Sequence, residues 1–148
     1  MEFYVDLGSV LTDNSAPYAT LWDTTVYAHN SSHSLVAKAF DAAGNVGTSQ
    51  SYSVTVLDIT PPSVTITNSV NGGTIPKNSL VTITANASDV SGINIVEFYV
   101  NGVLKCTDTS LPYSCNWQVP PRKNAVYSLQ AKAYDVANNT ATHTITVT

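Results

Sequence analysis

Short segments in which apolar and polar residues alternate recur along the chain. The clearest five lie in its second half: SVTIT (63–67), LVTITANA (80–87), VEFYVN (96–101), YSLQAKAY (127–134) and HTITVT (143–148). A period of two is typical of β-strands that bury one face and expose the other. In the third segment, Val96, Phe98 and Val100 share one face, and the residues between them point the other way.

Residues that favour turns separate these segments, and no stretch shows a convincing 3.6-residue period. The turn signals are NGG (71–73), SG (91–92), NG (101–102) and PP (120–121). About seven short strands in roughly 90 residues, without helices, predict an all-β protein built as an antiparallel β-sandwich. We expect Trp117 and Leu129 to anchor its core, because apolar residues on strands usually pack inside.

An internal repeat divides the chain into two copies of this pattern. Residues 2–22 align with residues 97–117 without a gap, and 10 of the 21 positions are identical. Farther on, LVAKAFDAAGN (35–45) matches LQAKAYDVANN (129–139). The two strand-like segments that precede residue 96 in the second copy have no counterpart in the first. The repeat predicts a partial module over 1–57 that lacks its first two strands, a linker over 58–62 and a complete module over 63–148.

Three parts of the second copy, VEFYVNG, TDTSLPYSCNW and YSLQAKAYDVANN, carry a family resemblance. Together they resemble the bacterial Ig-like domains that occur in tandem in secreted glycoside hydrolases, adhesins and other cell-surface proteins. The resemblance implies an immunoglobulin-like sandwich in both copies and an extracellular or cell-surface location within a larger exported chain. The family's A-x-D-x-A-G-N corner has Asn138 at the glycine position, and we expect the turn to be kept because Asn tolerates positive φ.

A sandwich without its first two strands leaves part of its core uncovered. In the first copy, this predicts an exposed apolar face and sheet edge formed by Phe3, Val5, Trp22, Leu35 and Val54. An open edge is a template for pairing with another chain, and strand addition is an established way to fill it. We therefore expect the first copy either to associate with itself or with neighbouring Ig-like domains, or to be poorly ordered.

The two cysteines of the chain, Cys106 and Cys115, flank a turn in the second copy. If the residues around them form neighbouring strands, the turn brings the two Cβ atoms within bridging distance. The pair then forms a disulfide that stabilises the fold by about 2.5–3 kcal/mol in the chain-entropy model. The first copy has Leu11 and Thr20 at these positions, so the fold does not require the bond. The alternative is a pair of reduced, buried thiols, which is less compatible with export.

Acidic residues in turns are candidate calcium ligands. Calcium takes six to eight oxygen ligands, and Ig-like arrays of the adhesin type often bind it where two modules meet. Asp58 in the linker with Asp89, or with Asp41 and Asn45, provides such oxygens. The alternative is that these side chains only accept hydrogen bonds from their own turns.

The sequence contains no pattern of catalytic residues. Its three histidines share no motif spacing, and its two glutamates, Glu2 and Glu97, occupy the same strand position in different copies. They cannot form a glycosidase pair, whose carboxylates face one bond about 5–10 Å apart. A net charge of −4 argues against a nucleic-acid partner. No apolar run approaches the roughly 20 residues of a membrane span, and no secretory signal follows Met1, so we expect an excised piece of any exported protein.

Three classes of function remain. We favour a noncatalytic structural or spacer module of a secreted or cell-surface bacterial protein. A second class is a carbohydrate-binding accessory module of a glycoside hydrolase or adhesin, and the third is a hydrolase fragment. Polysaccharide binding usually needs a strip of exposed aromatic rings; the candidates are Tyr4, Tyr18, Tyr27, Tyr99, Tyr113 and Tyr127.

Overall fold

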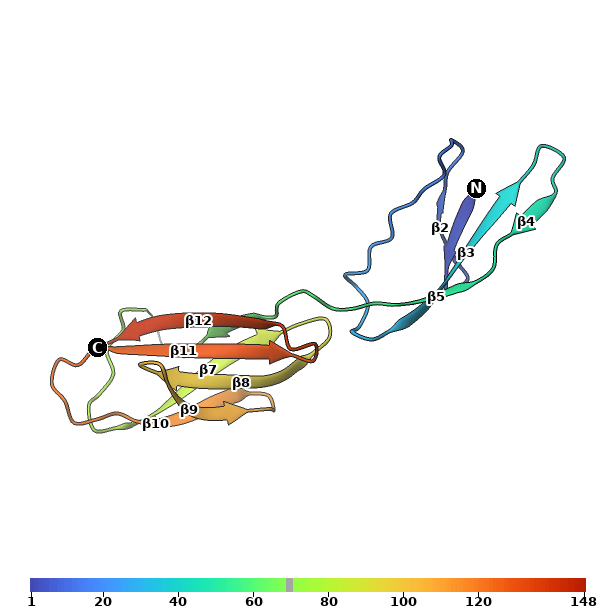
Figure 1. The fold of residues 1–148 in the computed structure, drawn as a ribbon. Helices are drawn as coiled ribbons and strands as arrows, with labels where there is room; N and C mark the ends of the chain where they lie inside the picture. Colours follow the sequence, from blue (N-terminus) through green and yellow to red (C-terminus); the bar gives the residue numbers. More distant parts are fainter. Residues whose placement is uncertain (69–70) are drawn as a thin grey trace. The chain divides into compact units, whose positions relative to one another are not determined.

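The computed structural model describes residues 1–68 and 71–148, and these residues form twelve β-strands (Figure 1). Contacts within the chain divide it into two compact units, Met1–Asp58 and Ile59–Thr148. The described residues include no helix long and apolar enough to cross a membrane.

The first unit contains one antiparallel sheet. Its strands are β1 (Glu2–Val5), β2 (Gly8–Thr12), β3 (Ser32–Phe40), β4 (Val46–Thr48) and β5 (Tyr52–Thr55). The order across the sheet is β2-β1-β3-β4, and β5 also pairs with β3. All residues from 1 to 58 are described, and no second sheet occurs among them.

The second unit is a sandwich of two antiparallel sheets. Its strands are β6 (Ser63–Ile66), β7 (Leu80–Ser88), β8 (Ile93–Val100), β9 (Val103–Asp108), β10 (Tyr113–Gln118), β11 (Tyr127–Asp135) and β12 (Thr140–Val147). One sheet has the order β10-β7-β6 and the other the order β12-β11-β8-β9. The predicted all-β sandwich class is confirmed.

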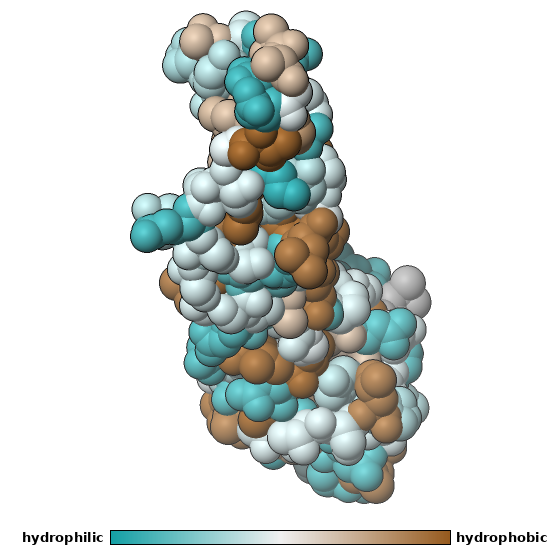
Figure 2. Space-filling model, turned by 90° about the vertical axis from the view of Figure 1, so that its right-hand side faces the viewer, coloured by the Kyte–Doolittle hydropathy of each residue, from teal (hydrophilic) through white to brown (hydrophobic). Residues whose placement is uncertain are grey.

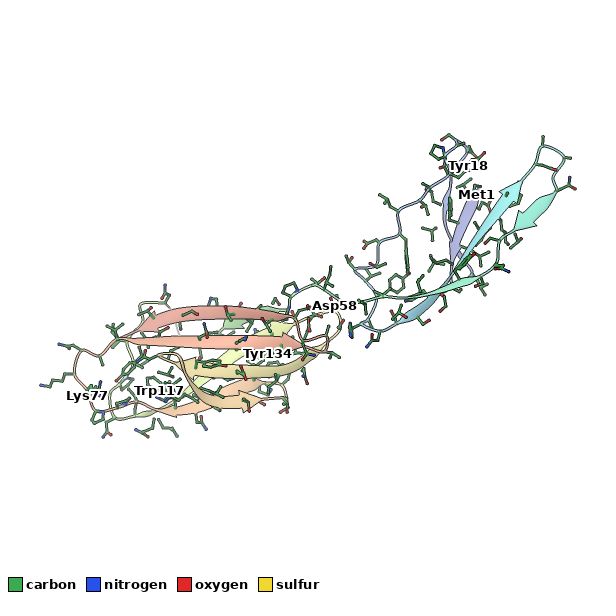
Figure 3. All side chains as sticks on the ribbon, viewed as in Figure 1. Met1, Tyr18, Asp58, Lys77, Trp117 and Tyr134 are labelled. Atoms are coloured by element: carbon green, nitrogen blue, oxygen red, sulfur yellow. A yellow bond between two sulfur atoms is a disulfide. The ribbon has the colours of Figure 1, made fainter. Side chains whose placement is uncertain are left out.

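The core of the second unit lies between these sheets, where the alternating residues point inward. Phe98, Val96, Leu129 and Ile83 are almost fully buried, and Trp117 packs edge-on against Tyr127 with ring centroids 4.9 Å apart. Trp117 lies among the strands of this unit in Figure 3. Trp117 and Leu129 therefore occupy the core positions that the pattern predicts.

The corner after β11 is closed by a buried carboxylate. Asp135 is 0% exposed, and it accepts hydrogen bonds from the backbone N–H and the side-chain amide of Asn139 at 2.8 and 2.9 Å. Asn138 has φ 68°, and Gly44 at the equivalent corner of the first unit has φ 86°. The expectation that Asn replaces Gly without loss of this turn is confirmed.

The predicted disulfide between Cys106 and Cys115 is present, with the Cα atoms 5.9 Å apart. Cys106 lies on β9 and Cys115 on β10, so the bond joins the two sheets of the sandwich. Cys115 is buried in the core. The disulfide therefore restrains the separation of the sheets as well as the turn between the two strands.

A candidate strand-binding face in the first unit

The sheet of the first unit carries an apolar face defined by strand register. Phe3 lies opposite Ala37, and Val5 lies opposite Leu35, across the β1–β3 pair. Directly opposite residues in an antiparallel pair point to the same side of the sheet. Val54 lies on this face as well, because it is opposite His33 and residues 33, 35 and 37 alternate along β3. These four apolar side chains and Val54 therefore lie on one face of the sheet.

The second unit repeats this arrangement residue for residue. Phe98 lies opposite Ala131, and Val100 lies opposite Leu129, across the β8–β11 pair. There the opposing sheet covers the face, and all four of these residues are buried. Phe3, Val5, Leu35 and Ala37 are instead only half-buried. The difference arises because the first unit has no sheet equivalent to β10-β7-β6.

The uncovered face forms a groove of about 360 Å³. No charged side chain lines it. The lining residues are Phe3, Tyr4, Val5, Val10, Thr20, Trp22, Leu35, Val36, Ala37, Ser49 and Tyr52. Four of the five residues predicted for the open edge are among them, and the fifth, Val54, shares the face by register. Large apolar side chains are exposed on both units, as the brown areas of Figure 2 illustrate.

One wall of the groove comes from residues 18–23, which are equivalent to β10. In the second unit, β10 is held in the sheet by its pairing with β7. Residues 18–23 form no strand and make no backbone–backbone hydrogen bond with the described residues. Leu21 is 97% exposed and Tyr18, labelled in Figure 3, is 48% exposed. The segment therefore has the sequence of a strand without the partner that would order it.

The loop before this segment keeps the same conformation in both units. The carboxylate of Asp13 accepts hydrogen bonds from the backbone N–H groups of Ser15 and Ala19, both at 3.0 Å. Asp108 accepts equivalent bonds from Ser110 and Ser114 at 3.1 and 2.9 Å. In each case the backbone donors lower the pKa of the carboxyl group. The two loops are therefore held by equivalent hydrogen bonds, and residues 18–23 lack the pairing that β7 gives to β10.

Three aromatic rings close one end of the face. His33 packs edge-on against Trp22 and Tyr27, with ring centroids 5.4 and 4.3 Å away. Its Nδ1 atom lies 2.5 Å from a carboxylate oxygen of Asp6, and its Nε2 atom lies 2.8 Å from the hydroxyl of Ser31. The backbone N–H of Ser34, and then His33, lower the pKa of Asp6. The Nε1–H of Trp22 is buried and has no acceptor among the described residues.

Two of the candidate calcium ligands, Asp41 and Asp89, accept hydrogen bonds from their own turns. Asp41 accepts hydrogen bonds from the backbone N–H and side-chain amide of Asn45 at 2.8 and 2.7 Å, and these donors lower its pKa. Asp89 accepts a bond from the backbone N–H of Ser91 at 2.8 Å. Within the second unit, carboxylate oxygens of Asp89 and Asp135 lie within 4.8 Å of one another. Asp58 belongs to the first unit. Calcium binding by these residues remains a prediction.

The tyrosines that suggested carbohydrate binding do not form one exposed strip. Tyr113 and Tyr127 are buried in the core of the second unit. Tyr99 donates a hydrogen bond of 2.6 Å to Glu97, and Tyr4 donates the equivalent bond to Glu2. This bond raises the pKa of Tyr99 to about 12. Carbohydrate binding remains a prediction that relies on the other candidates, and a polysaccharide pull-down tests it.

Comparison with known proteins agrees with this architecture. The chain is similar to the solved structure of the fibronectin(III)-like modules of Clostridium thermocellum CbhA, with 25% sequence identity and a TM-score of 0.54. The match covers 99% of this chain and 75% of that one. A search of curated protein sequences found no match. The class defined by the fold is therefore an immunoglobulin-like or fibronectin III-like β-sandwich.

The family follows from the sequence of the second unit. A profile of the family described as "Bacterial Ig domain" matches residues 62–147, which is more than half of the chain. The chain belongs to the bacterial Ig domain family. The matched region coincides with the two-sheet sandwich, and the first unit shares its strand register without its second sheet.

Proposed function

We propose that the chain is a noncatalytic structural module of an exported bacterial protein, and that its first unit associates with another copy or with a neighbouring Ig-like domain. Bacterial Ig and fibronectin III-like domains are typically extracellular. The cross-sheet disulfide supports an oxidising location, because such bonds persist mainly outside the cytosol.

The open face of the first unit is the observation that carries this proposal. In the second unit the same four residues, in the same register, are buried by an opposing sheet. The first unit leaves its equivalents half-buried around an uncharged groove. Exposed apolar patches rimmed by polar residues are typical of interaction sites. An association that covers this face replaces the missing sheet.

Light scattering over a concentration series, combined with hydrogen exchange, tests the association. We expect a species larger than the monomer, with protection of the first unit that increases with protein concentration. Leu35→Asn places a polar group on the face and is expected to shift the equilibrium to monomer. Ser53→Asn, at an exposed position on the other side of the sheet and outside the groove lining, is the matched control and leaves the association unchanged. A strictly monomeric protein whose residues 1–58 are as protected as residues 59–148 rules the proposal out.

A further inference from the structure

We propose that residues 18–23 bind an extended β-strand with the residue pattern of β7, in the antiparallel register that β10 uses with β7. This inference rests on the proposed function and specifies the partner and its geometry. The second unit contains the completed form of the same interaction, so the register can be transferred directly from one unit to the other.

The register follows from the alignment of the two copies. In the second unit, Cys115 lies opposite Ile83, and Trp117 lies opposite Val81. Their equivalents in the first unit are Thr20 and Trp22. The incoming strand therefore places its Ile83-like residue opposite Thr20 and its Val81-like residue opposite Trp22. Both positions point into the groove, because Thr20 and Trp22 line it.

The side chains on the outer face of the pair are fixed by the same register. Asn116 lies opposite Thr82, whose hydroxyl donates a 2.7 Å hydrogen bond to the Asn116 amide oxygen. Leu21, the equivalent of Asn116, is 97% exposed. A residue at the Thr82 position of the incoming strand therefore contacts position 21. This contact does not involve the groove.

The uncharged lining of the groove favours a strand without charged residues, as β7 is. The groove has no charged lining residue, and β7, with the sequence LVTITANAS, has no charged residue either. Charged side chains are excluded from such a site because burial without a partner is costly. The inward positions of β7 carry small or β-branched residues, and Ile83 and Ala85 are almost fully buried in the second unit. Backbone hydrogen bonds to residues 18–23 provide affinity, as in other cases of strand addition.

A folded second unit cannot donate its own β7. That strand is the central one of its sheet, and its inward residues belong to the core. Removal of β7 would expose the buried side chains of Ile83 and Ala85 and open the core of the second unit. The donor is therefore a strand of β7 pattern that is not already part of a complete sandwich. The packing of two open faces against each other in a dimer is the competing outcome.

Register-specific disulfide formation tests the proposal on the full chain. Both native cysteines are bonded to each other, so an added cysteine is the single free thiol. Two chain variants are used, Thr20→Cys and Leu21→Cys. The probes are synthetic peptides of residues 80–88, each carrying one pyridyl-activated cysteine in place of Thr82, Ile83 or Thr84. The initial rate of thiopyridone release is measured for every combination.

The two chain variants have opposite expected preferences. Thr20→Cys reacts at least tenfold faster with the Ile83→Cys peptide than with the other two, because cross-strand Cβ atoms are near only for directly opposite residues. Leu21→Cys instead prefers the Thr82→Cys peptide. Leu21 is almost fully exposed, so this variant is expected to fold even if Thr20→Cys perturbs the loop. Thr140→Cys, at an exposed position of the second unit, reacts equally with all three peptides.

Equal rates for the three peptides with both variants overturn the inference. If the protein is also dimeric by light scattering under these conditions, the proposed association stands and the face is covered by a second copy. If the protein is monomeric and its first unit is protected without peptide, the proposed function fails too. The two failures are therefore distinguishable.

Discussion

The two units have the same strand pairing and different interiors. Phe3 pairs with Ala37 as Phe98 pairs with Ala131, but only the second pair is buried. Local sequence and register are therefore enough to build one sheet. A core requires a second layer, because the apolar face of a sheet is removed from water only by another element. The first unit thus has a paired sheet without a closed core, and the second unit has the same sheet with the stability that burial provides.

Replacement of the paired phenylalanines tests this difference most strongly. We expect Phe98→Ala to lower the free energy of unfolding of the second unit by about 3–5 kcal/mol, the usual cost in a packed core. Phe3→Ala removes a half-buried ring and is expected to cost the first unit about 1 kcal/mol. Hydrogen exchange measured separately for each unit gives both values. Equal losses would show that the first unit has a closed core.

Removal of the disulfide is expected to lower the stability of the second unit only, because both cysteines lie in it. A double variant with Cys106→Ala and Cys115→Ala is expected to lose about 2.5–3 kcal/mol of stability in the second unit, on the loop-entropy estimate. A Trp22→Phe background leaves Trp117 as the single tryptophan, so its fluorescence reports unfolding of this unit. Reductant lowers the stability of the parent and leaves the double variant unchanged. The absence of a difference between oxidised parent and variant contradicts the prediction.

The calcium prediction is tested in the Trp22→Phe background with both cysteines present. Calcium at a hundred times its Kd stabilises a folded unit by about 2.7 kcal/mol. If Asp89 contributes a ligand, a chelator lowers the melting temperature of the second unit, and Asp89→Asn abolishes the shift. Asp41→Asn, in the other unit, is the control and preserves it. If chelator does not change the melt of the second unit, Asp89 is removed from the prediction.

Acid is expected to weaken the second unit partly through Asp108. Backbone N–H groups of Ser114 and Ser110 lower the pKa of this carboxyl group in the folded state. The stabilisation is therefore present above the unfolded pKa of about 3.9 and is lost as the pH falls through the lower folded value. Asp108→Asn should flatten this part of the stability profile by at most about 1 kcal/mol, because the site is partly solvated. A variant with the parent's acid profile argues against this role.

At Tyr99 the expected change is in a pKa rather than in the stability of a unit. Its hydrogen bond to Glu97 raises its pKa to about 12, and Glu97→Gln should return the value toward 10. An NMR titration with labelled tyrosine rings measures the change. Glu2→Gln should lower the pKa of Tyr4 in the same direction, because Glu2 holds that hydroxyl in the first unit. An unchanged Tyr99 titration in Glu97→Gln means that the bond is absent in solution.

Much of the fold could be predicted from alternation and the repeat. The strands of the second unit, its core residues Trp117 and Leu129, the disulfide and the turn at Asn138 follow from local patterns. The state of residues 18–23 could not be predicted from their own sequence, which matches β10 at Tyr18 and Trp22. Whether these residues form a strand depends on a distant partner. Likewise, the sequence alone does not show whether Tyr113 and Tyr127 are exposed for carbohydrate binding or buried. The packing of the two sheets places both rings in the core.

The disulfide also has a mechanical consequence if the chain is the structural module that we propose. A chain pulled from both ends lengthens by about 3.3–3.6 Å for each residue that unravels. The bond excludes the nine-residue separation between Cys106 and Cys115 from this extension. The second unit therefore extends about 25 Å less when oxidised than when reduced, after the 5.9 Å between the two Cα atoms is subtracted. The redox state of one bond therefore changes the maximum length of the second unit under tension by this amount.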